Sequence, residues 1–135
     1  PNVEWVGAVP RKEVWQQYRE ASCLCLPSLS EGSATVVYEA LACGLPVIVT
    51  PHCGSIARDG VEGLVVPIRD PVALASAIRV LAVDRNRRQR MSEAALLRAQ
   101  YGSLQSYGRR LVDLIRKVSS AVTGNTQLAG PSPCE

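Results

Sequence analysis

Short apolar runs alternate along the chain with segments in which apolar side chains recur every three or four residues. The runs "NVEWVG", "CLCLP", "LPVIVT" and "GLVVP" predict strands at residues 2–7, 23–27, 45–50 and 63–67. The periodic segments predict helices at 10–22, 34–43, 71–81, 85–101 and 104–118, the first with Val14, Tyr18 and Ala21 on one face. Strands that alternate with helices form parallel sheets with right-handed crossovers. The pattern therefore predicts an α/β fold with a partial doubly wound parallel sheet and flanking helices.

Residues with strong positional preferences mark where these helices begin and end. Asp70, followed by Pro71, is typical of a helix start, with aspartate as the N-cap and proline in the first turn. Asp84 and Ser103 are placed to cap the two helices that follow. Gly44 stands where a left-handed residue often ends a helix. The run "CLCLP" is apolar throughout, so we expect its strand to be covered on both faces.

The order of the elements predicts one domain followed by a tail. We assign residues 1–122 to the α/β domain and residues 123–135, "TGNTQLAGPSPCE", to a disordered tail. About four strands are predicted, whereas a doubly wound sheet has roughly five or six. Met91 is the single methionine, so Pro1 is not expected to be a natural start. We therefore interpret the chain as the C-terminal part of a longer protein, with its domain truncated at the N-terminus.

The composition is that of a globular domain and argues against several classes of protein. Of the 135 residues, 47% are hydrophobic and 20% are charged. The net charge of +3 is too small to indicate nucleic-acid binding. No apolar run approaches the roughly 20 residues that span a bilayer, and the first residues do not resemble a signal peptide. We expect a cytoplasmic protein whose five cysteines are reduced and buried.

Two glutamates in the stretch "SEGSATVVYEALACGLPVIVT" carry the candidate chemistry. Glu31 and Gly32 follow the strand at 23–27, and ligands of open α/β sheets bind at the carboxyl ends of the strands. Free N–H groups at the start of the helix at 34–43 favour a phosphate. Glu39 lies one to two turns into this helix, and its side chain leans back toward the same edge. A phosphate at the helix start and a ribose beside the Glu39 carboxylate together predict a bound nucleoside diphosphate.

The spacing of the two glutamates argues against a hydrolase with paired carboxylates. Eight residues of helix span about 12 Å, at a rise of roughly 1.5 Å per residue. The two carboxylates of a glycosidase lie about 5–9.5 Å apart. We therefore expect Glu31 and Glu39 to contact different parts of one ligand.

The string "EGSATVVYEALACGLPVIVT" resembles the E-x7-E signature of the retaining, nucleotide-sugar-dependent glycosyltransferases of group 1. The resemblance extends from about Val3 to Leu114 and includes "WVG", Pro27-Ser28 and "DGVEGLVVP". It implies a GT-B fold, of which this chain is the C-terminal, donor-binding half with a Rossmann-like sheet. It also implies transfer of a sugar from a nucleotide-diphosphate sugar to an acceptor, with retention of the anomeric configuration. Polysaccharide or glycolipid biosynthesis is the expected setting.

The resemblance also implies a role for each residue of the motif. Glu39 would bind the ribose hydroxyls of the donor. Glu31 would be the catalytic residue, in contact with the donor sugar near the reacting carbon. Sugar and diphosphate would be held by backbone groups of Gly32, Ser33, Ala34 and Thr35. The family is generally metal-independent, and the chain has no Asp-x-Asp motif, so we expect no metal and no further cofactor.

Two features depart from the family pattern. Ser33-Ala34 stands where the family often has Phe-Gly after Glu-Gly, although Ser33 is also placed to cap the helix. The basic residues that neutralise the diphosphate usually lie upstream, as does the acceptor-binding domain. We therefore expect the missing N-terminal GT-B domain to be a partner, and the chain alone to be inactive.

Other interpretations stay open. A GT-B-type nucleotide-sugar epimerase or a non-catalytic nucleotide-sugar binding module would bind the same donor. A flavodoxin-like signalling domain needs several acidic residues at its strand ends, where this chain supplies only Glu31. We expect His52 to be solvated, although it lies in a loop that approaches the ligand. The cluster "RNRRQR" forms either a solvated helix face or a peripheral contact with anionic lipid at the inner membrane face, through Arg85, Arg87, Arg88 and Arg90.

Overall fold

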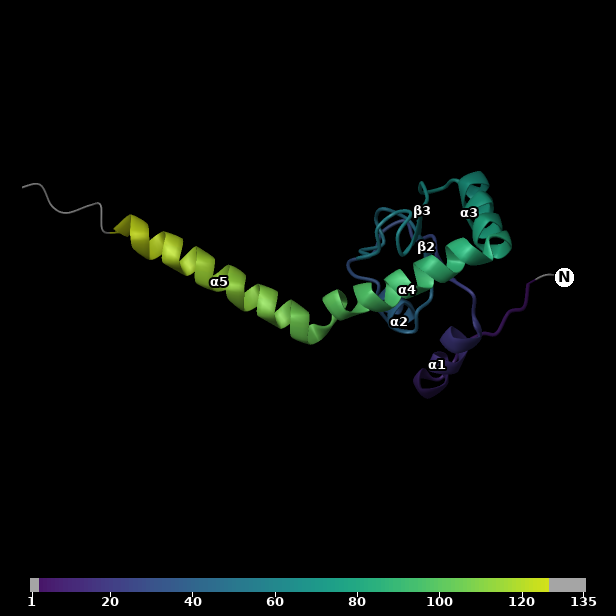
Figure 1. Cartoon of the computed structure of the whole chain (residues 1–135), viewed down its shortest axis with the longest axis horizontal. Coiled ribbons are helices and arrows are strands. Elements are labelled where there is room, and N and C mark those ends of the chain that lie inside the picture. Colours follow the sequence, from purple (N-terminus) through teal and green to yellow (C-terminus); the bar gives the residue numbers. More distant parts are fainter. Residues whose placement is uncertain (1–2, 127–135) are drawn as a thin grey trace, which may run out of the picture. The chain divides into compact units, whose positions relative to one another are not determined.

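The sheet contains three parallel strands. The computed structural model describes residues 3–126, with side chains up to residue 122 (Figure 1). In this part of the chain β1 (Leu24–Leu26), β2 (Val47–Val49) and β3 (Gly63–Val65) pair in the order β1-β2-β3. Leu24 lies opposite Val47, and Val47 lies opposite Gly63. The parallel sheet with flanking helices confirms the predicted α/β fold class.

The helices follow the predicted order. They are α1 (Arg11–Glu20), α2 (Thr35–Ala42), α3 (Pro71–Val83), α4 (Arg85–Gly102) and α5 (Leu104–Thr126). The Ala73 N–H donates a 2.8 Å hydrogen bond to Asp70 Oδ1, which confirms Asp70 as the N-cap of α3. Gly44 follows the last turn of α2 with a φ of 72°, as its predicted capping position requires.

The predicted caps of the last two helices are also confirmed. The Arg87 N–H donates a 2.8 Å hydrogen bond to Asp84 Oδ1 before α4. The Ser106 N–H donates to Ser103 Oγ at 3.2 Å before α5. Local side-chain chemistry thus fixes where these helices begin.

Two predictions about the strands are wrong. Residues 3–7 form no strand, and Trp5 in this segment is 92% exposed. A strand needs a neighbour to complete its hydrogen bonds, and no other strand of the described chain lies beside this segment. β1 is an edge strand, where the flanking helices give less cover, so Cys25 is exposed rather than buried.

Helices cover both faces of the sheet because the side chains of β2 alternate between them. Val47 and Val49 pack on one face with residues of α1, α2 and α4, including Leu41. Ile48 packs on the other face with residues of α3 and α4, including Leu81. The sheet is therefore the middle layer of three, and the loops at the carboxyl ends of its strands remain at an uncovered edge.

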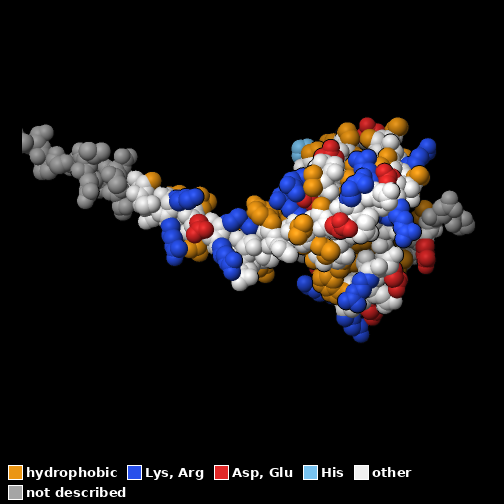
Figure 2. Space-filling model, in the orientation of Figure 1, with side chains coloured by type: hydrophobic (Ala, Val, Ile, Leu, Met, Phe, Trp, Pro, Cys, Tyr) orange, Lys and Arg blue, Asp and Glu red, His pale blue; other side chains and the backbone are white. Residues whose placement is uncertain are grey.

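The chain divides into two compact units, residues 1–100 and 101–135. Within the second unit, the Arg110 guanidinium lies 4.0 Å from the centre of the Tyr101 ring. Figure 2 shows basic and apolar side chains interleaved along α5. α5 continues to Thr126, whereas the rest of the predicted tail, residues 127–135, lies outside the described residues. In the part of the chain that is described, no helix has the length and apolarity needed to cross a membrane.

Candidate functional site

Hydrogen bonds connect the loop that follows β1, residues 27–34, to the loop that follows β2, residues 50–62; we call these two the joined loops. The Glu31 N–H donates a 2.8 Å hydrogen bond to the His52 carbonyl. The buried Thr50 hydroxyl donates to the Ser28 carbonyl. The Glu31 side chain is exposed, and the Ser28 hydroxyl lies 3.4 Å from its Oε1. Glu31 and Gly32 therefore belong to an anchored pair of loops at the carboxyl edge of the sheet.

Gly54 determines how closely these two loops approach. Its φ is +64°, and a Cβ at this position would lie 2.5 Å from the Gly32 carbonyl oxygen and 2.8 Å from the Ser33 Cα. Because both contacts are to backbone, only glycine fits without displacing the loop that carries Glu31. Gly54 lies outside the glutamate-containing stretch and was not predicted as a site residue. Its position in the loop that follows a strand was the feature of the sequence that could have indicated it.

The start of α2 carries no side-chain cap. Its N-cap is Ala34, so the prediction that Ser33 caps this helix is wrong. The helix begins one residue later than that prediction requires, and the Ser33 hydroxyl instead lies 3.4 Å from the Tyr38 hydroxyl. Ala34 itself is buried, with 6% of its surface exposed. Uncapped N–H groups and the positive end of the helix dipole favour an anion at this position.

Glu39 is held by a tyrosine of another helix. The Tyr18 hydroxyl donates a 3.0 Å hydrogen bond to Glu39 Oε2. Burial, reinforced by the hydrogen bond and the negative charge of Glu39, raises the pKa of Tyr18 to about 12. The tyrosine therefore keeps its proton at neutral pH and remains a donor, while the carboxylate retains lone pairs for a ligand. The hydrophobic pattern predicted Tyr18 on the apolar face of the first helix, but it did not predict the hydrogen bond to Glu39. The polar hydroxyl of an otherwise apolar side chain was the feature that could have indicated it.

A hollow of about 370 Å³ lies beside Glu39, between α1 and α2. Its walls are mainly apolar, and Arg11 contributes a positive charge. The lining residues are Val9, Arg11, Val14, Trp15, Thr35, Val36 and Glu39. The structure thus brings Thr35 and Glu39 together, whereas Glu31, Gly32 and Ser33 lie in the loop that leads into α2. Nothing in the motif indicated Arg11 or Trp15, which come from a different helix.

An ion pair between the exposed Arg58 and the buried Glu62 fixes the loop between β2 and β3. Glu62 is completely buried, and it accepts hydrogen bonds from the Arg58 backbone N–H at 2.7 Å and from the Arg58 Nε at 3.1 Å. Burial by itself raises the pKa of Glu62, but the hydrogen bonds and charge of Arg58 outweigh burial and lower the pKa. Arg98 of α4 donates a 2.7 Å hydrogen bond to the Ile56 carbonyl in the same loop. This loop also carries Gly54, so these contacts hold in place the loop that packs against Gly32.

The basic cluster at the start of α4 does not form one uniform charged face. Arg88 is partly buried and donates to two carbonyls at the C-terminal end of α3, one of them that of Leu81. Its charge therefore stabilises the end of α3. Arg85 and Arg90 are exposed, and Arg87 is partly buried. Arg85 and Arg88 are one turn apart, whereas Arg87 and Arg90 follow a different line along the helix.

The other candidate ligands are dispersed. Within the described part of the chain, no three His, Cys, Asp or Glu side chains lie close enough together to hold a metal ion. The cysteines of this part, Cys23, Cys25, Cys43 and Cys53, are free. The His52 side chain is exposed, and it is the backbone carbonyl of this residue that contacts Glu31.

Comparison with known proteins identifies the family. The model of the family described as "Glycosyl transferases group 1" matches residues 1–98, which include the sheet, the joined loops and α2. The chain belongs to the group 1 glycosyltransferases. The family predicted from the glutamate-containing string is thus confirmed.

Relatives of this glycosyltransferase chain share its sequence over a limited part of their own length. It is 39% identical over 98 residues to the D-inositol 3-phosphate glycosyltransferase of Kribbella flavida, covering 71% of this chain and 23% of that protein. It is 30% identical over 124 residues to the protein of the same name from a Nocardioides species, covering 90% of this chain and 27% of that protein. The chain therefore spans about a quarter of the length of these relatives.

A solved structure agrees with the fold of the group 1 chain. Sucrose-phosphate synthase from Thermosynechococcus elongatus superposes with a TM-score of 0.72 at 28% identity. The superposition covers 86% of this chain and 30% of the synthase. The sequence comparisons thus identify the family, and the structural comparison agrees with the fold.

Proposed function

We propose that this group 1 glycosyltransferase takes a sugar from a nucleotide-diphosphate sugar and transfers it with retention of the anomeric configuration. The chain described here supplies the donor-binding part. The observation that carries the proposal is the position of Glu39, which Tyr18 holds beside the uncapped start of α2. Glu39 lies four residues after Thr35, the first residue of α2, which is about 6 Å along the helix axis. A carboxylate and a helix start about this far apart suit the ribose and the diphosphate of one donor.

The donor lies along α2 in this proposal. Glu39 accepts hydrogen bonds from the ribose hydroxyls, and the backbone of residues 32–35 holds the diphosphate and sugar. Arg11 adds positive charge to the hollow that Glu39 lines. Because helix N–H groups and a guanidinium offset part of the diphosphate charge, the reaction requires no metal and no further cofactor.

Glu31 has the catalytic role in this proposal. Its backbone is fixed by the His52 carbonyl, so the exposed carboxylate starts from an anchored loop. The carboxylate contacts the donor sugar beside the carbon at which the glycosidic bond breaks. The leaving diphosphate gains negative charge as the bond breaks. Each hydrogen-bond donor of the protein that is already in place at that moment contributes about 3–4 kcal/mol to catalysis.

The complete reaction needs partners that bind the acceptor. We propose that a further domain, N-terminal to this one in a GT-B arrangement, binds a glycan or lipid-linked acceptor. The chain by itself then binds the donor without completing transfer. A cytoplasmic location fits this chemistry, and Arg85 and Arg88 at the start of α4 provide a peripheral contact with anionic lipid at the inner membrane face.

Nucleotide titration tests the assignment of Glu39. We expect one of UDP, GDP or ADP to bind the chain in titration calorimetry, and Glu39→Gln to weaken that binding by about 1–3 kcal/mol through lost charged hydrogen bonds. Glu93→Gln, an exposed glutamate change on α4, is the matched control and should leave the affinity unchanged. Equal affinity of the Glu39→Gln protein and the unchanged chain would refute the ribose contact.

A further inference from the structure

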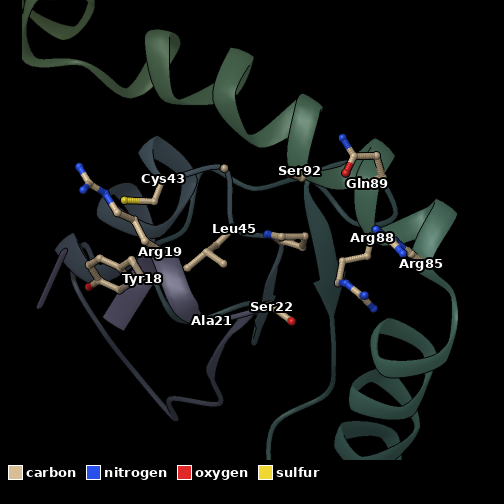
Figure 3. Close-up of a pocket in the computed structure, with 12 residues that line it drawn as sticks. Tyr18, Arg19, Ala21, Ser22, Cys43, Leu45, Arg85, Arg88, Gln89 and Ser92 are labelled. Atoms are coloured by element: carbon tan, nitrogen blue, oxygen red, sulfur yellow. The ribbon is translucent and has the colours of Figure 1, made fainter. Parts of the chain in front are cut away.

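A second hollow lies at the opposite edge of the sheet from the joined loops. Ser22 and Pro46 line it, and these residues come just before β1 and β2 begin. It is therefore at the amino ends of the strands, whereas the joined loops are at the carboxyl ends. The hollow has a volume of about 280 Å³ and lies between α1, α4 and the turn after α2 (Figure 3).

Three arginines and no acidic side chain line this hollow. Arg19 enters from α1, and Arg85 and Arg88 enter from the first turns of α4 on the other side (Figure 3). Gln89 and Ser92 continue the same face of α4, because residues three or four apart are neighbours on a helix. The hollow is therefore positively charged along one wall and rich in hydrogen-bond donors.

Two of these arginines are available for a ligand. The side chains of Arg19 and Arg85 are exposed, and they form no ion pair or hydrogen bond with another described residue. Arg88 is positioned by its bonds to the carbonyls that end α3. A guanidinium has five N–H donors, so Arg88 keeps donors in addition to those it uses there.

We propose that this hollow binds the phosphate group of a small phosphate monoester. The guanidinium groups of Arg85 and Arg88 form charged hydrogen bonds with the phosphate oxygens. The Ser92 hydroxyl donates to a further oxygen of the ligand, and so does the second N–H of the Gln89 amide, whose first N–H donates a 3.0 Å hydrogen bond to Glu93 Oε1. The body of the ester extends toward Arg19 on the other side.

The size of the hollow limits the class of ligand. Pockets for drug-sized ligands have volumes of roughly 300–1,000 Å³. At about 280 Å³ this hollow has room for one phosphate with a small polyol body. The phosphate is therefore that of a soluble sugar or polyol phosphate, or that of a phospholipid headgroup. This hollow is separate from the proposed donor site, although Tyr18, which lines it, donates a hydrogen bond to Glu39 in the other hollow.

Phosphate binding at constant ionic strength tests the proposal. The probe is inorganic phosphate, titrated at pH 8 into the 135-residue chain and monitored through the backbone amide signals of Gly44 and Ser92 by NMR. We expect saturable shifts in the unchanged chain and about tenfold weaker binding in Arg85→Gln, because a charged hydrogen-bond pair is lost. Arg90→Gln removes the same charge from the same helix outside the hollow, and it should change the affinity by less than about twofold.

Vesicles distinguish the two sources of the phosphate. Co-sedimentation is compared for vesicles of phosphatidylcholine alone and vesicles containing phosphatidic acid. Binding to phosphatidic acid that Arg85→Gln abolishes and Arg90→Gln spares assigns the site to a lipid headgroup. Saturable binding of free phosphate with no vesicle binding assigns it to a soluble ester.

Two results overturn the proposal. One is the absence of saturable phosphate shifts together with the absence of selective vesicle binding in the unchanged chain. The other is an equal loss of binding in Arg85→Gln and Arg90→Gln, which would indicate attraction by general charge. Arg88→Gln removes the second guanidinium that contacts the phosphate and should also weaken binding, so the test does not depend on Arg85→Gln alone, and circular dichroism verifies that each variant is folded.

Discussion

The Tyr18 hydroxyl donates a hydrogen bond of 3.0 Å to Glu39 Oε2 and so connects α1 to α2. The two residues are 21 positions apart in the sequence. A ligand-binding carboxylate that is already oriented loses less entropy when the ligand arrives. Tyr18 therefore acts as a positioning residue for Glu39 in the proposed donor site.

Removal of the tyrosine hydroxyl should affect stability and nucleotide binding together. We expect Tyr18→Phe to lower the free energy of unfolding by about 1 kcal/mol, the usual net contribution of one hydrogen bond. Nucleotide affinity should also fall, because Glu39 loses its orientation. Urea unfolding and titration calorimetry measure the two effects. In the control Tyr38→Phe, which loses a longer 3.4 Å contact, both effects should be smaller.

A side chain at position 54 should disturb the joined loops. Gly54→Ala combines a φ of +64° with a Cβ 2.5 Å from the Gly32 carbonyl oxygen. Gly60→Ala is the matched control, because Gly60 has a φ of +73° but nothing within 4 Å of the added Cβ. We expect Gly60→Ala to cost about 1–2 kcal/mol for the backbone conformation alone and Gly54→Ala to cost clearly more. Similar losses in thermal unfolding of the two variants would show that the contact with Gly32 is unimportant.

The Arg58–Glu62 pair should make stability depend on pH. The folded-state pKa of Glu62 is lowered, so its stabilising contribution is complete above the unfolded-state pKa, near 4.5. This contribution is lost as the pH falls through the lower folded-state pKa. Glu62→Gln should therefore cost about 1.5–3 kcal/mol at pH 7, the value of hydrogen bonds to a charged group. The cost lies toward the lower end because the Arg58 side chain is 59% exposed.

Urea unfolding at pH 7 and at pH 3 measures this dependence. The difference between the unchanged chain and Glu62→Gln should shrink at pH 3, because the glutamate of the unfolded chain binds a proton below pH 4.5 more readily than the folded one does. A difference that stays constant between the two pH values would mean that the Glu62 charge does not contribute.

Arg88 and Arg90 should differ in their effect on stability. Arg88→Gln removes the cation that pairs with the carbonyls ending α3, and we expect a loss of about 0.5–1.5 kcal/mol. Arg90 is exposed, so Arg90→Gln should change the free energy of unfolding by less than about 0.5 kcal/mol. Chemical unfolding of both variants measures the difference. Equal effects would contradict the capping role of Arg88.

Some parts of the donor site were accessible to reasoning from sequence and others were not. Glu31, Gly32 and Glu39 were found because a strand, a loop and a helix follow one another within one short stretch. Their supports come from elsewhere: Tyr18 lies before β1, and Gly54 lies after β2. No local pattern relates such positions, because only packing across the sheet brings them together.

The sequence by itself determined the helices, most of their caps and the parallel direction of the strands. These features depend on hydrophobic period and on side-chain bonds between near neighbours, which the chain specifies locally. Tertiary structure decided that residues 3–7 form no strand and that Cys25 is exposed, because pairing and cover depend on which elements lie beside a segment. It also decided that Ala34, rather than Ser33, is the N-cap of α2, since the anchored loops set where that helix begins.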